Sequence, residues 1–237
     1  MKRDRERADF DSTAAAYDAW CETPLGRLVD RLEKEAVFAL VEARPGDLAL
    51  DLSCGTGNYA LALAEQGIRV VGLDRSEPML RTAQAKARRA GVAIPLIRAD
   101  GRALPLRAST FDVVAVILGL EFTADAGQTL EEARRVLKPG ARLVVAILDR
   151  AGLWTSWRRL KRRLVGSIWR DAAFFTADEL RGLLETRGFA DLRWRGAVHF
   201  LPLCRTRGVA WLARWETLAA RWAPGRATFL AVAARRP

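Results

Sequence analysis

Residues 48–57, Leu-Ala-Leu-Asp-Leu-Ser-Cys-Gly-Thr-Gly, join a short apolar run to a glycine loop, and this junction indicates the class of fold. The apolar run predicts a buried strand, and the loop leads into a predicted helix over residues 57–66. Glycines at such a junction let the backbone approach a ligand closely, and the first helical turn offers backbone amides without partners. The stretch therefore predicts a ligand-binding strand, loop and helix unit.

Strands and helices continue to alternate on both sides of this unit. Ser76 is a suitable N-cap and Gly91 a suitable end for the helix between them, and crossovers of this length imply a mostly parallel sheet covered on both faces. We predict an α/β fold, a Rossmann-like doubly wound sheet of seven strands with an antiparallel last strand and a helical cap. The strands after the first are predicted over residues 68–74, 94–99, 111–117, 142–148, 192–200 and 228–234, and the other helices over 28–43, 76–90, 127–137 (ending at Lys138-Pro139-Gly140) and from Thr176 to Gly188.

Charge and tryptophan divide the chain unequally. Residues 1–149 have a net charge of −1, whereas residues 150–237 have a net charge of +12 and contain seven of the eight tryptophans. We predict an N-terminal helical segment over 1–46, a Rossmann-like core over 47–149, and a C-terminal part of the same domain over 150–237. Two basic, Trp-rich cap insertions are expected within that last part, at about 150–175 and 201–226.

Composition argues against several classes of protein. The longest nearly unbroken apolar run, residues 113–120, is far shorter than the roughly 20 residues of a membrane span, and no apolar segment follows the charged N-terminus as in a secretory signal. Cys21, Cys54 and Cys204 are scattered, and the chain has a single histidine. These features disfavour a disulfide framework or a metal site, so we expect a cytoplasmic protein without a metal.

Asp74 gives the glycine loop a second feature. It ends the next predicted strand, 17 residues after Gly57, where a carboxylate can accept hydrogen bonds from both hydroxyls of a ribose. Gly55-x-Gly57-x-x-Ala60 also satisfies the dinucleotide fingerprint, so NAD is a candidate cofactor. That fingerprint explains neither the acid at Asp51 nor Asp100. A tight turn with a helix-capping aspartate is the purely structural alternative.

Five ordered motifs over about 90 residues resemble a known family. They are Asp51 to Gly57; Val71-Gly-Leu-Asp74-x-Ser76-x-x-Met79-Leu80; Ala99-Asp100-Gly-x-Ala-Leu-Pro105-Leu; Ser109-x-Phe111-Asp112-Val-Val; and Arg135-Val-Leu-Lys-Pro-Gly140. The series resembles class I S-adenosylmethionine-dependent methyltransferases of type 11, in particular the branch that includes the ubiquinone/menaquinone C-methyltransferases. Ser53 departs from the pattern, because the family usually has the first glycine of its loop there. Serine is small, so we expect cofactor binding to survive in a narrower space.

The resemblance implies a role for each matched position. The loop, including Asp51, Ser53, Gly55 and Gly57, would contact the methionine part of S-adenosylmethionine, and Asp74 would hold the ribose. Asp100 would accept a hydrogen bond from the adenine amine, with the Gly101 amide beside it.

Four further positions carry implied roles that have structural alternatives. Met79 and Leu80 fall where the family packs the adenine, and the Leu118 carbonyl would meet the amino group of the methionine part. Plain core packing would also explain all three. The segment from Phe10 to Trp20 is similar to the family's N-terminal segment, which would place Tyr17 near the cofactor carboxylate, although Tyr17 could simply anchor a helix.

Two residues are candidate general bases. His199 is near the end of a predicted strand, and histidine titrates near neutral pH, but it could equally be a satisfied edge residue. Glu121 lies in the loop after the strand over 111–117, where ligands gather in such sheets. Many relatives have histidines in this loop and this chain has none, which weakens the expectation of a base there.

The Trp-rich insertions admit several partners. Residues 153–169, LWTSWRRLKRRLVGSIW, place tryptophan and leucine on one helical face and cations on the rest. This pattern fits a cap helix or lid, an interfacial helix on an anionic membrane, an RNA-binding surface, or a dimer interface. No familiar RNA-recognition module is visible, which disfavours nucleic acid. In the second insertion, Trp211, Trp215 and Trp222, with Leu212 and Leu218, repeat the helical spacing, and we expect the two insertions to form an aromatic roof over the acceptor.

Together, these observations favour methyl transfer from S-adenosylmethionine to a hydrophobic or amphipathic small molecule, such as a quinone, a lipid-like compound or an aromatic compound. An RNA methyltransferase that uses the basic C-terminal region is one alternative. A non-catalytic S-adenosylmethionine-binding protein is another. A cytoplasmic enzyme is expected, with peripheral membrane contact left open.

Overall fold

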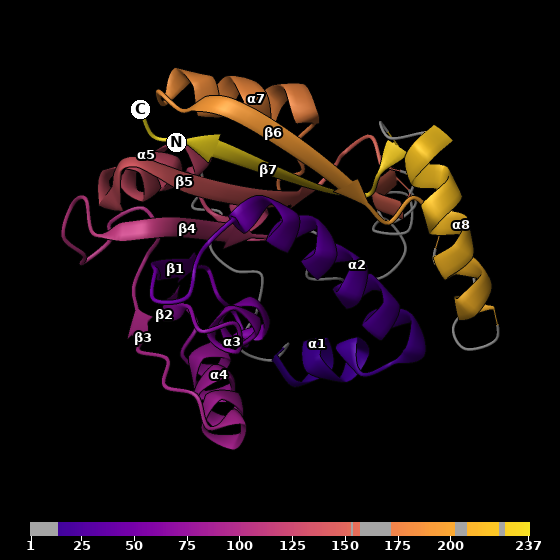
Figure 1. The fold of residues 1–237 in the computed structure, drawn as a ribbon, viewed down its shortest axis with the longest axis horizontal. Coiled ribbons are helices and arrows are strands. Elements are labelled where there is room, and N and C mark those ends of the chain that lie inside the picture. The colour runs from indigo at the N-terminus through magenta and orange to yellow at the C-terminus, as the bar shows by residue number, and fades with distance from the viewer. Residues whose placement is uncertain (1–13, 153, 157–171, 202–207, 223–225) are drawn as a thin grey trace, which may run out of the picture.

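The computed structural model describes residues 14–152, 154–156, 172–201, 208–222 and 226–237. Its centre is a seven-stranded sheet with the order β3-β2-β1-β4-β5-β7-β6 (Figure 1). The strands are β1 (Leu48–Leu52), β2 (Arg69–Asp74), β3 (Leu96–Arg98), β4 (Phe111–Ile117), β5 (Leu137–Leu148), β6 (Ala190–Ala197) and β7 (Phe229–Arg235). The helices are α1 (Ala14–Cys21), α2 (Pro24–Val41), α3 (Asn58–Ala64), α4 (Glu77–Ala90), α5 (Ala126–Val136), α7 (Ala177–Thr186) and α8 (Val209–Trp222), with a 3₁₀ turn η1 (Leu120–Phe122).

The strand order reverses at β1, which pairs in parallel with both β2 and β4. β7 pairs antiparallel with β5 on one side and with β6 on the other. The predicted mostly parallel, seven-stranded sheet with an antiparallel last strand is therefore confirmed. In such sheets the loops after two neighbouring strands diverge at the reversal, which opens a crevice at their carboxyl ends.

Helices cover both faces of the sheet, and successive strand residues point into different layers. Ala49 of β1 packs in the cluster that contains α2 and α3. The next residue, Leu50, packs in the cluster that contains α5 and α7. Strands buried on both faces are mostly apolar, which explains why every residue of β1 except Asp51 is hydrophobic.

Local capping fixes where the helices begin and end. The Ser76 hydroxyl accepts a hydrogen bond from Met79 N, and Gly91 ends α4 in the left-handed region at φ 68°. Thr176 and Glu179 form a complete capping box at the start of α7. The predicted N-cap at Ser76 and helix end at Gly91 are confirmed, and the helix predicted from Thr176 begins with this capping box. The helix predicted over 28–43 begins earlier, at Pro24, because Thr23 caps it and proline is suited to a first turn.

The prediction that a strand starts at Arg142, after a helix that ends at Lys138-Pro139-Gly140, is corrected by the structure. α5 already ends at Val136, and β5 begins at Leu137. Phe111 of β4 pairs with Leu137, but Val113 pairs with Arg142, so the residues between them bulge out of the ladder. A bulge accommodates a proline and a glycine that would otherwise interrupt pairing.

The C-terminal part contributes one described cap helix, α8, which packs against α2 and β6 at one end of the sheet (Figure 1). Of the amphipathic segment predicted over 153–169, only 154–156 belong to the described residues, and they are helical. The rest of that prediction lies outside the described part of the chain. None of the described helices is long and apolar enough to cross a membrane.

Candidate active site

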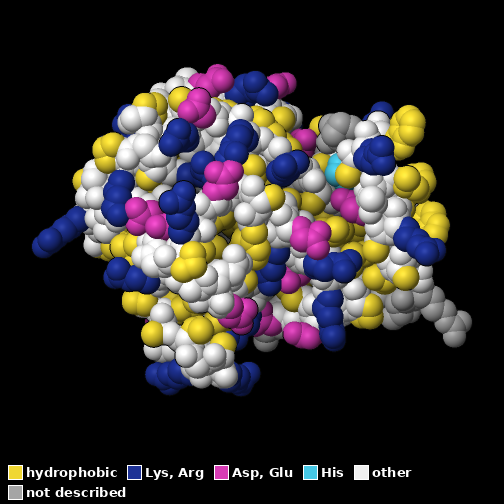
Figure 2. Space-filling model, in the orientation of Figure 1, with side chains coloured by type: hydrophobic (Ala, Val, Ile, Leu, Met, Phe, Trp, Pro, Cys, Tyr) yellow, Lys and Arg dark blue, Asp and Glu magenta, His cyan; other side chains and the backbone are white. Residues whose placement is uncertain are grey.

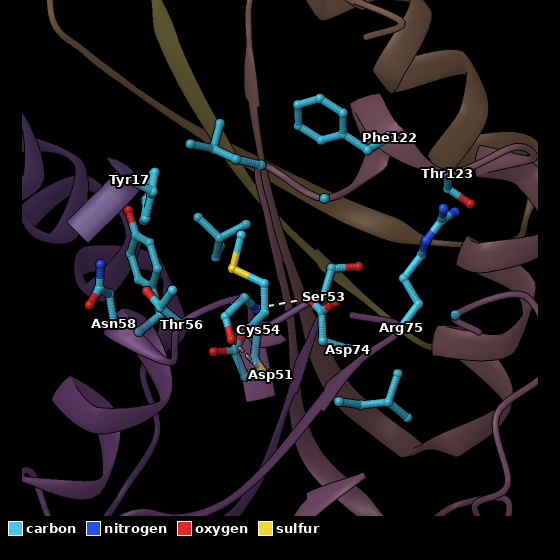
Figure 3. A pocket seen from close by; sticks show the side chains of 18 of the residues that line it. Tyr17, Asp51, Ser53, Cys54, Thr56, Asn58, Asp74, Arg75, Phe122 and Thr123 are labelled. Carbon is cyan, nitrogen blue, oxygen red and sulfur yellow. Dashed lines mark hydrogen bonds between the residues drawn. The ribbon is translucent and has the colours of Figure 1, made fainter. Parts of the chain in front are cut away.

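A cavity of about 380 Å³ lies where β1, β2 and β4 end. Its walls come from the loop after β1, from Asp74 at the end of β2, from Asp100 after β3 and from Leu118 after β4. α1 and α2 close one side. Figure 3 shows Tyr17, Thr56 and Asn58 together on one side of the cavity, and Phe122 and Thr123 on the opposite side. The cavity therefore occupies the reversal point of the sheet.

The loop after β1 has the backbone conformation that glycine favours, but it contains a serine. Ser53 adopts φ 65° and Gly55 φ 52°, both in the left-handed region. A Cβ on Gly119 would lie 2.6 Å from Ser53 Cβ, so the serine side chain occupies space that Gly119 leaves open. The expected loss of space in the loop at Ser53 is thus accommodated by Gly119, in the loop after β4.

Gly57 has a different role from the one that the resemblance implies. It caps α3 at φ 80° and does not line the cavity. A Cβ at this position would lie 2.9 Å from Ala83 Cβ in α4. The glycine therefore permits α3 and α4 to approach each other closely, and the structure does not support the predicted ligand contact.

Backbone amides hold Asp74 in place. Its Oδ2 accepts a hydrogen bond from Gly55 N and its Oδ1 accepts one from Ser76 N, both at 2.9 Å. Burial raises the pKa of Asp74, and these backbone bonds oppose that rise. Each carboxylate oxygen can accept more than one hydrogen bond, so the fixed carboxylate retains capacity for two ligand hydroxyls at the cavity wall.

Asp51 contributes a second buried acid. Its Oδ2 has no hydrogen-bond partner among the described residues, although its side chain lines the cavity. Burial raises the pKa of Asp51 to about 7, and the nearby charge of Asp74 adds to the effect. A buried carboxylate oxygen without a partner is costly, and a cationic ligand group in the cavity would offset that cost.

A polar network fixes α1 over the glycine loop. Lys86 Nζ lies 2.8 and 2.9 Å from the two carboxylate oxygens of Asp18, 3.1 Å from Thr56 Oγ1 and 2.6 Å from Asn58 Oδ1. Thr56 Oγ1 also donates to Asp18 Oδ1 at 2.8 Å. The network thus places Tyr17, the neighbour of Asp18 on α1, at the cavity wall. Asp18 and Lys86 could not be predicted as site residues, because no short-range spacing links them in the sequence.

The remaining predicted cofactor positions differ in placement. Asp100 lines the cavity and forms an ion pair with Arg102 at 2.7 Å, and that hydrogen-bonded pairing lowers the pKa of Asp100. Gly101, Met79 and Leu118 also line the cavity. Leu80 is buried in the fold and does not, so core packing accounts for it.

The cavity has an apolar part as well. Its side chains come from the ends of β4, β5 and β6 and from the first insertion: Ile117, Leu118, Phe122, Leu148, Trp154 and Val198. Trp154 is the described residue through which the first predicted insertion reaches the site. Val198 adopts φ 62°, which is unusual for a β-branched residue and occurs where the chain turns out of β6.

Glu121 does not line the cavity. Its side chain is buried, Oε1 accepts a hydrogen bond from Leu148 N at 2.8 Å, and its carbonyl accepts one from Ala173 N at 2.7 Å. Burial raises the pKa of Glu121 to about 7. The side chain braces η1 against the end of β5, so its placement does not support the prediction of a general base.

His199 is likewise buried outside the cavity lining. Its Nδ1 lies 2.9 Å from Glu216 Oε1, and the backbone N of Val198 and of His199 also donate to Glu216. Glu216 belongs to α8, so the histidine joins β6 to the cap helix. The placement gives no support to His199 as a base.

The predicted aromatic roof is wrong for the second insertion. Trp211, Trp215, Trp222 and Leu218 are exposed, and only Leu212 of the predicted set is buried. None of the five lines the cavity. Within the described ranges, no group of three or more His, Cys, Asp or Glu side chains is arranged to hold a metal ion.

Comparison with known proteins agrees with this geometry. Residues 50–145 match the profile of a family described as a methyltransferase domain. An uncharacterized protein of Mycobacterium tuberculosis is 37% identical over 191 residues, which are 80% of this chain and 62% of that protein. A ubiquinone/menaquinone biosynthesis C-methyltransferase of Acidiphilium cryptum is 42% identical over 147 residues, 60% of this chain and 57% of that protein. The chain thus spans about three fifths of the length of these curated relatives.

Solved structures share the fold over nearly the whole chain. A SAM-dependent methyltransferase of Thermotoga maritima superposes with a TM-score of 0.75 at 23% identity, covering 96% of this chain and 98% of that one. The match extends beyond the region of the family profile, to the antiparallel strands at the end of the sheet.

Proposed function

Because the chain belongs to the class I S-adenosylmethionine-dependent methyltransferases, we propose that it methylates a hydrophobic or amphipathic small molecule. One observation carries the proposal: a single cavity joins the acids Asp51, Asp74 and Asp100 to the apolar side chains of Phe122 and Trp154. A polar cofactor and an apolar acceptor need such adjoining surfaces if they are to react within one water-poor space.

The residues at the polar end fit S-adenosylmethionine. The unpartnered Oδ2 of Asp51 is suited to a cationic group, and the fixed carboxylate of Asp74 to the ribose hydroxyls. Tyr17 and the loop around Ser53 would enclose the methionine part, and Asp100 would face the adenine. When bound, the cofactor supplies an already activated methyl group.

The protein then has to align the acceptor and exclude water more than it has to supply strong acid–base chemistry. Phe122, Trp154 and Val198 would hold an apolar acceptor. Where the acceptor must lose a proton, we assign the base to Glu33 of α2. Its buried side chain lines the same cavity, whereas Glu121 and His199 do not line it.

The relatives favour a quinone-like acceptor among apolar molecules. The Acidiphilium cryptum protein is named as a ubiquinone/menaquinone biosynthesis C-methyltransferase. A flat ring system also suits a cavity that contains Phe122 and Trp154.

Calorimetric titration with S-adenosylmethionine, S-adenosylhomocysteine and NAD tests the cofactor assignment. We expect micromolar binding of the first two and none of NAD. Asp74→Ala should weaken S-adenosylmethionine binding about 100-fold or more, since two hydrogen bonds to a charged group are lost. Asp112→Asn, which removes a carboxylate paired with Lys138 at the other end of β4, should leave the affinity unchanged. Equal affinity in both variants would contradict the ribose assignment.

A transfer assay with labelled methyl groups tests the acceptor. Reduced naphthoquinones and benzoquinones, phenolic lipids and total RNA are supplied as acceptors. Phe122→Ala should raise KM for an apolar acceptor about tenfold, the equivalent of roughly 1.4 kcal/mol of lost contact, and should leave the Kd of S-adenosylmethionine unchanged. Methylation of RNA alone would establish the alternative that the basic region 150–237 suggests, and cofactor binding without transfer to any acceptor would indicate a non-catalytic protein.

A further inference from the structure

The cap helix α8 has its large apolar side chains on the outside. Trp211, Trp215, Leu218 and Trp222 follow one another at helical spacing and are 61%, 46%, 50% and 85% exposed. Among the described residues they are the large hydrophobic side chains that solvent reaches most. The face that packs on the protein carries Leu212, Glu216 and Ala219 instead. We call the four exposed residues the aromatic face of α8.

The aromatic face has an ordered shape. The rings of Trp211 and Trp215 are stacked, with centroids 5.8 Å apart and an interplanar angle of 11°. Three tryptophan side chains in contact with water do not contribute the stabilisation that aromatic side chains give when they are buried. A contiguous exposed patch of this kind marks an interaction surface.

Buried hydrogen bonds prevent α8 from turning this face inward. Glu216 accepts from Val198 N at 2.8 Å, from His199 N at 2.7 Å, and pairs with His199 Nδ1 at 2.9 Å. Rotation of the helix would carry Glu216 away and leave the buried backbone N–H groups of Val198 and His199 without an acceptor, which is unfavourable. The fold thus fixes the aromatic face toward the outside.

The exposed charged side chains on α8 and at Arg226, within the described part of the chain, all have the same sign. Arg214 and Arg221 are exposed on α8 and Arg226 is exposed just after it, whereas Glu216, the single acid of this helix, is buried. Figure 2 shows dark blue basic side chains beside the yellow hydrophobic ones along α8. The whole segment 150–237 has a net charge of +12. The natural complement of this surface is therefore apolar and negatively charged.

We propose that the aromatic face of α8 docks on an anionic lipid bilayer. Tryptophan and leucine enter the boundary between headgroups and acyl chains, and flanking arginines bind acidic headgroups. A second copy of the chain is a poorer partner, since a twofold interface would bring Arg214 and Arg221 of both copies together. The proposal concerns attachment alone and does not depend on methyl transfer.

Sedimentation with vesicles tests the proposal on the full chain. Vesicles of phosphatidylcholine alone are compared with vesicles that also contain phosphatidylglycerol. We expect binding to the acidic vesicles, with a blue shift of tryptophan emission, and little binding to the neutral ones. The triple variant W211A/W215A/W222A should lose at least tenfold in partition coefficient while its melting temperature and its affinity for S-adenosylmethionine stay unchanged.

A matched pair of charge variants separates a local surface from net charge. R214A/R221A should weaken binding about 30-fold, roughly fivefold for each cation removed from an acidic surface. R88A/R89A removes the same charge from exposed positions at the end of α4, which packs on β2 and β3 at the other end of the sheet, and should change binding less than threefold. Equal effects of the two pairs would overturn the proposal. Two results in the absence of vesicle binding would also overturn the proposal. One is a wild-type dimer that becomes a monomer in the triple tryptophan variant, and the other is binding of single-stranded RNA that depends on the tryptophans.

Discussion

Removal of the Lys86 ammonium, by Lys86→Met, is expected to detach α1 from the cofactor loop. Lys86 Nζ contacts both oxygens of Asp18 and the side-chain oxygens of Thr56 and Asn58, at 2.6 to 3.1 Å. Hydrogen bonds to charged groups contribute about 1.5–3 kcal/mol each when buried. The Lys86 and Asp18 side chains are 24% and 26% exposed, so solvent screening reduces the coupling between them to about 1–2 kcal/mol.

A double-mutant cycle in urea measures this coupling from wild type, D18N, K86M and the double variant. Because Tyr17 lies beside Asp18, K86M should also weaken S-adenosylmethionine binding about tenfold, the equivalent of roughly 1.4 kcal/mol. Lys34 is the matched control. It pairs with Asp30 at the same 2.8 Å with 25% and 26% exposure, but within α2, so K34M should cost only about 0.5 kcal/mol and leave the affinity unchanged. If K86M and K34M behave alike in both measurements, the reasoning fails.

Three further predictions concern stability. Burial raises the pKa of Asp51 and of Glu121 to about 7 from their ordinary values of 3.8 and 4.5. The folded chain therefore binds more protons than the unfolded chain between about pH 4 and 7, and stability is lost as pH rises through 7. The free energy of unfolding in urea should fall by on the order of 2 kcal/mol per group between pH 5 and 8. D51N and E121Q should each make this free energy depend less on pH. An unchanged pH dependence in these variants would refute the raised pKa values of the two groups. Ser53→Gly should raise the free energy of unfolding by up to about 1 kcal/mol, since a left-handed conformation costs serine more than glycine; a loss of stability would show that the serine side chain contributes packing. Gly57→Ala should lower the free energy of unfolding by about 2–3 kcal/mol and Gly91→Ala by about 1 kcal/mol. Both glycines have a left-handed backbone, but only a Cβ at position 57 meets a neighbour. Equal losses of stability in thermal and urea melts would contradict the close contact between α3 and α4.

The sheet could be predicted from the sequence where burial on both faces requires a mostly apolar run. The bounds predicted for β1 and β4 agree with the structure for this reason, although each strand includes one aspartate. The start of β5 could not be predicted, because Pro139-Gly140 is typical of a chain break between elements. Only the pairing with β4 shows that the strand begins before these two residues.

Some features of the candidate site and its surroundings could likewise be predicted from the sequence, and others could not. Asp51 and Asp74 are the fourth residue of β1 and the last residue of β2, and these strands are neighbours in a parallel sheet. Their approach to one cavity could therefore be predicted. The orientation of α8 could not, since helical spacing defines two faces and hydropathy favours burying the tryptophans. The contacts of Glu216 with β6 decide otherwise, and such long-range hydrogen bonds leave no local pattern in the sequence.

The position of β7 has a consequence for how the chain reaches this fold during synthesis. β7 is the last strand in the sequence, yet it lies between β5 and β6. The edge of β5 therefore has no partner while the ribosome adds the roughly 80 residues that separate Leu148 from Phe229, about 4–16 s at 5–20 residues per second. During that interval an apolar strand edge, of the kind that pairs with foreign chains, is open. A nascent chain arrested before Phe229 should thus be an aggregation-prone client of chaperones, and the cavity side of the sheet would be built well before its far edge is closed.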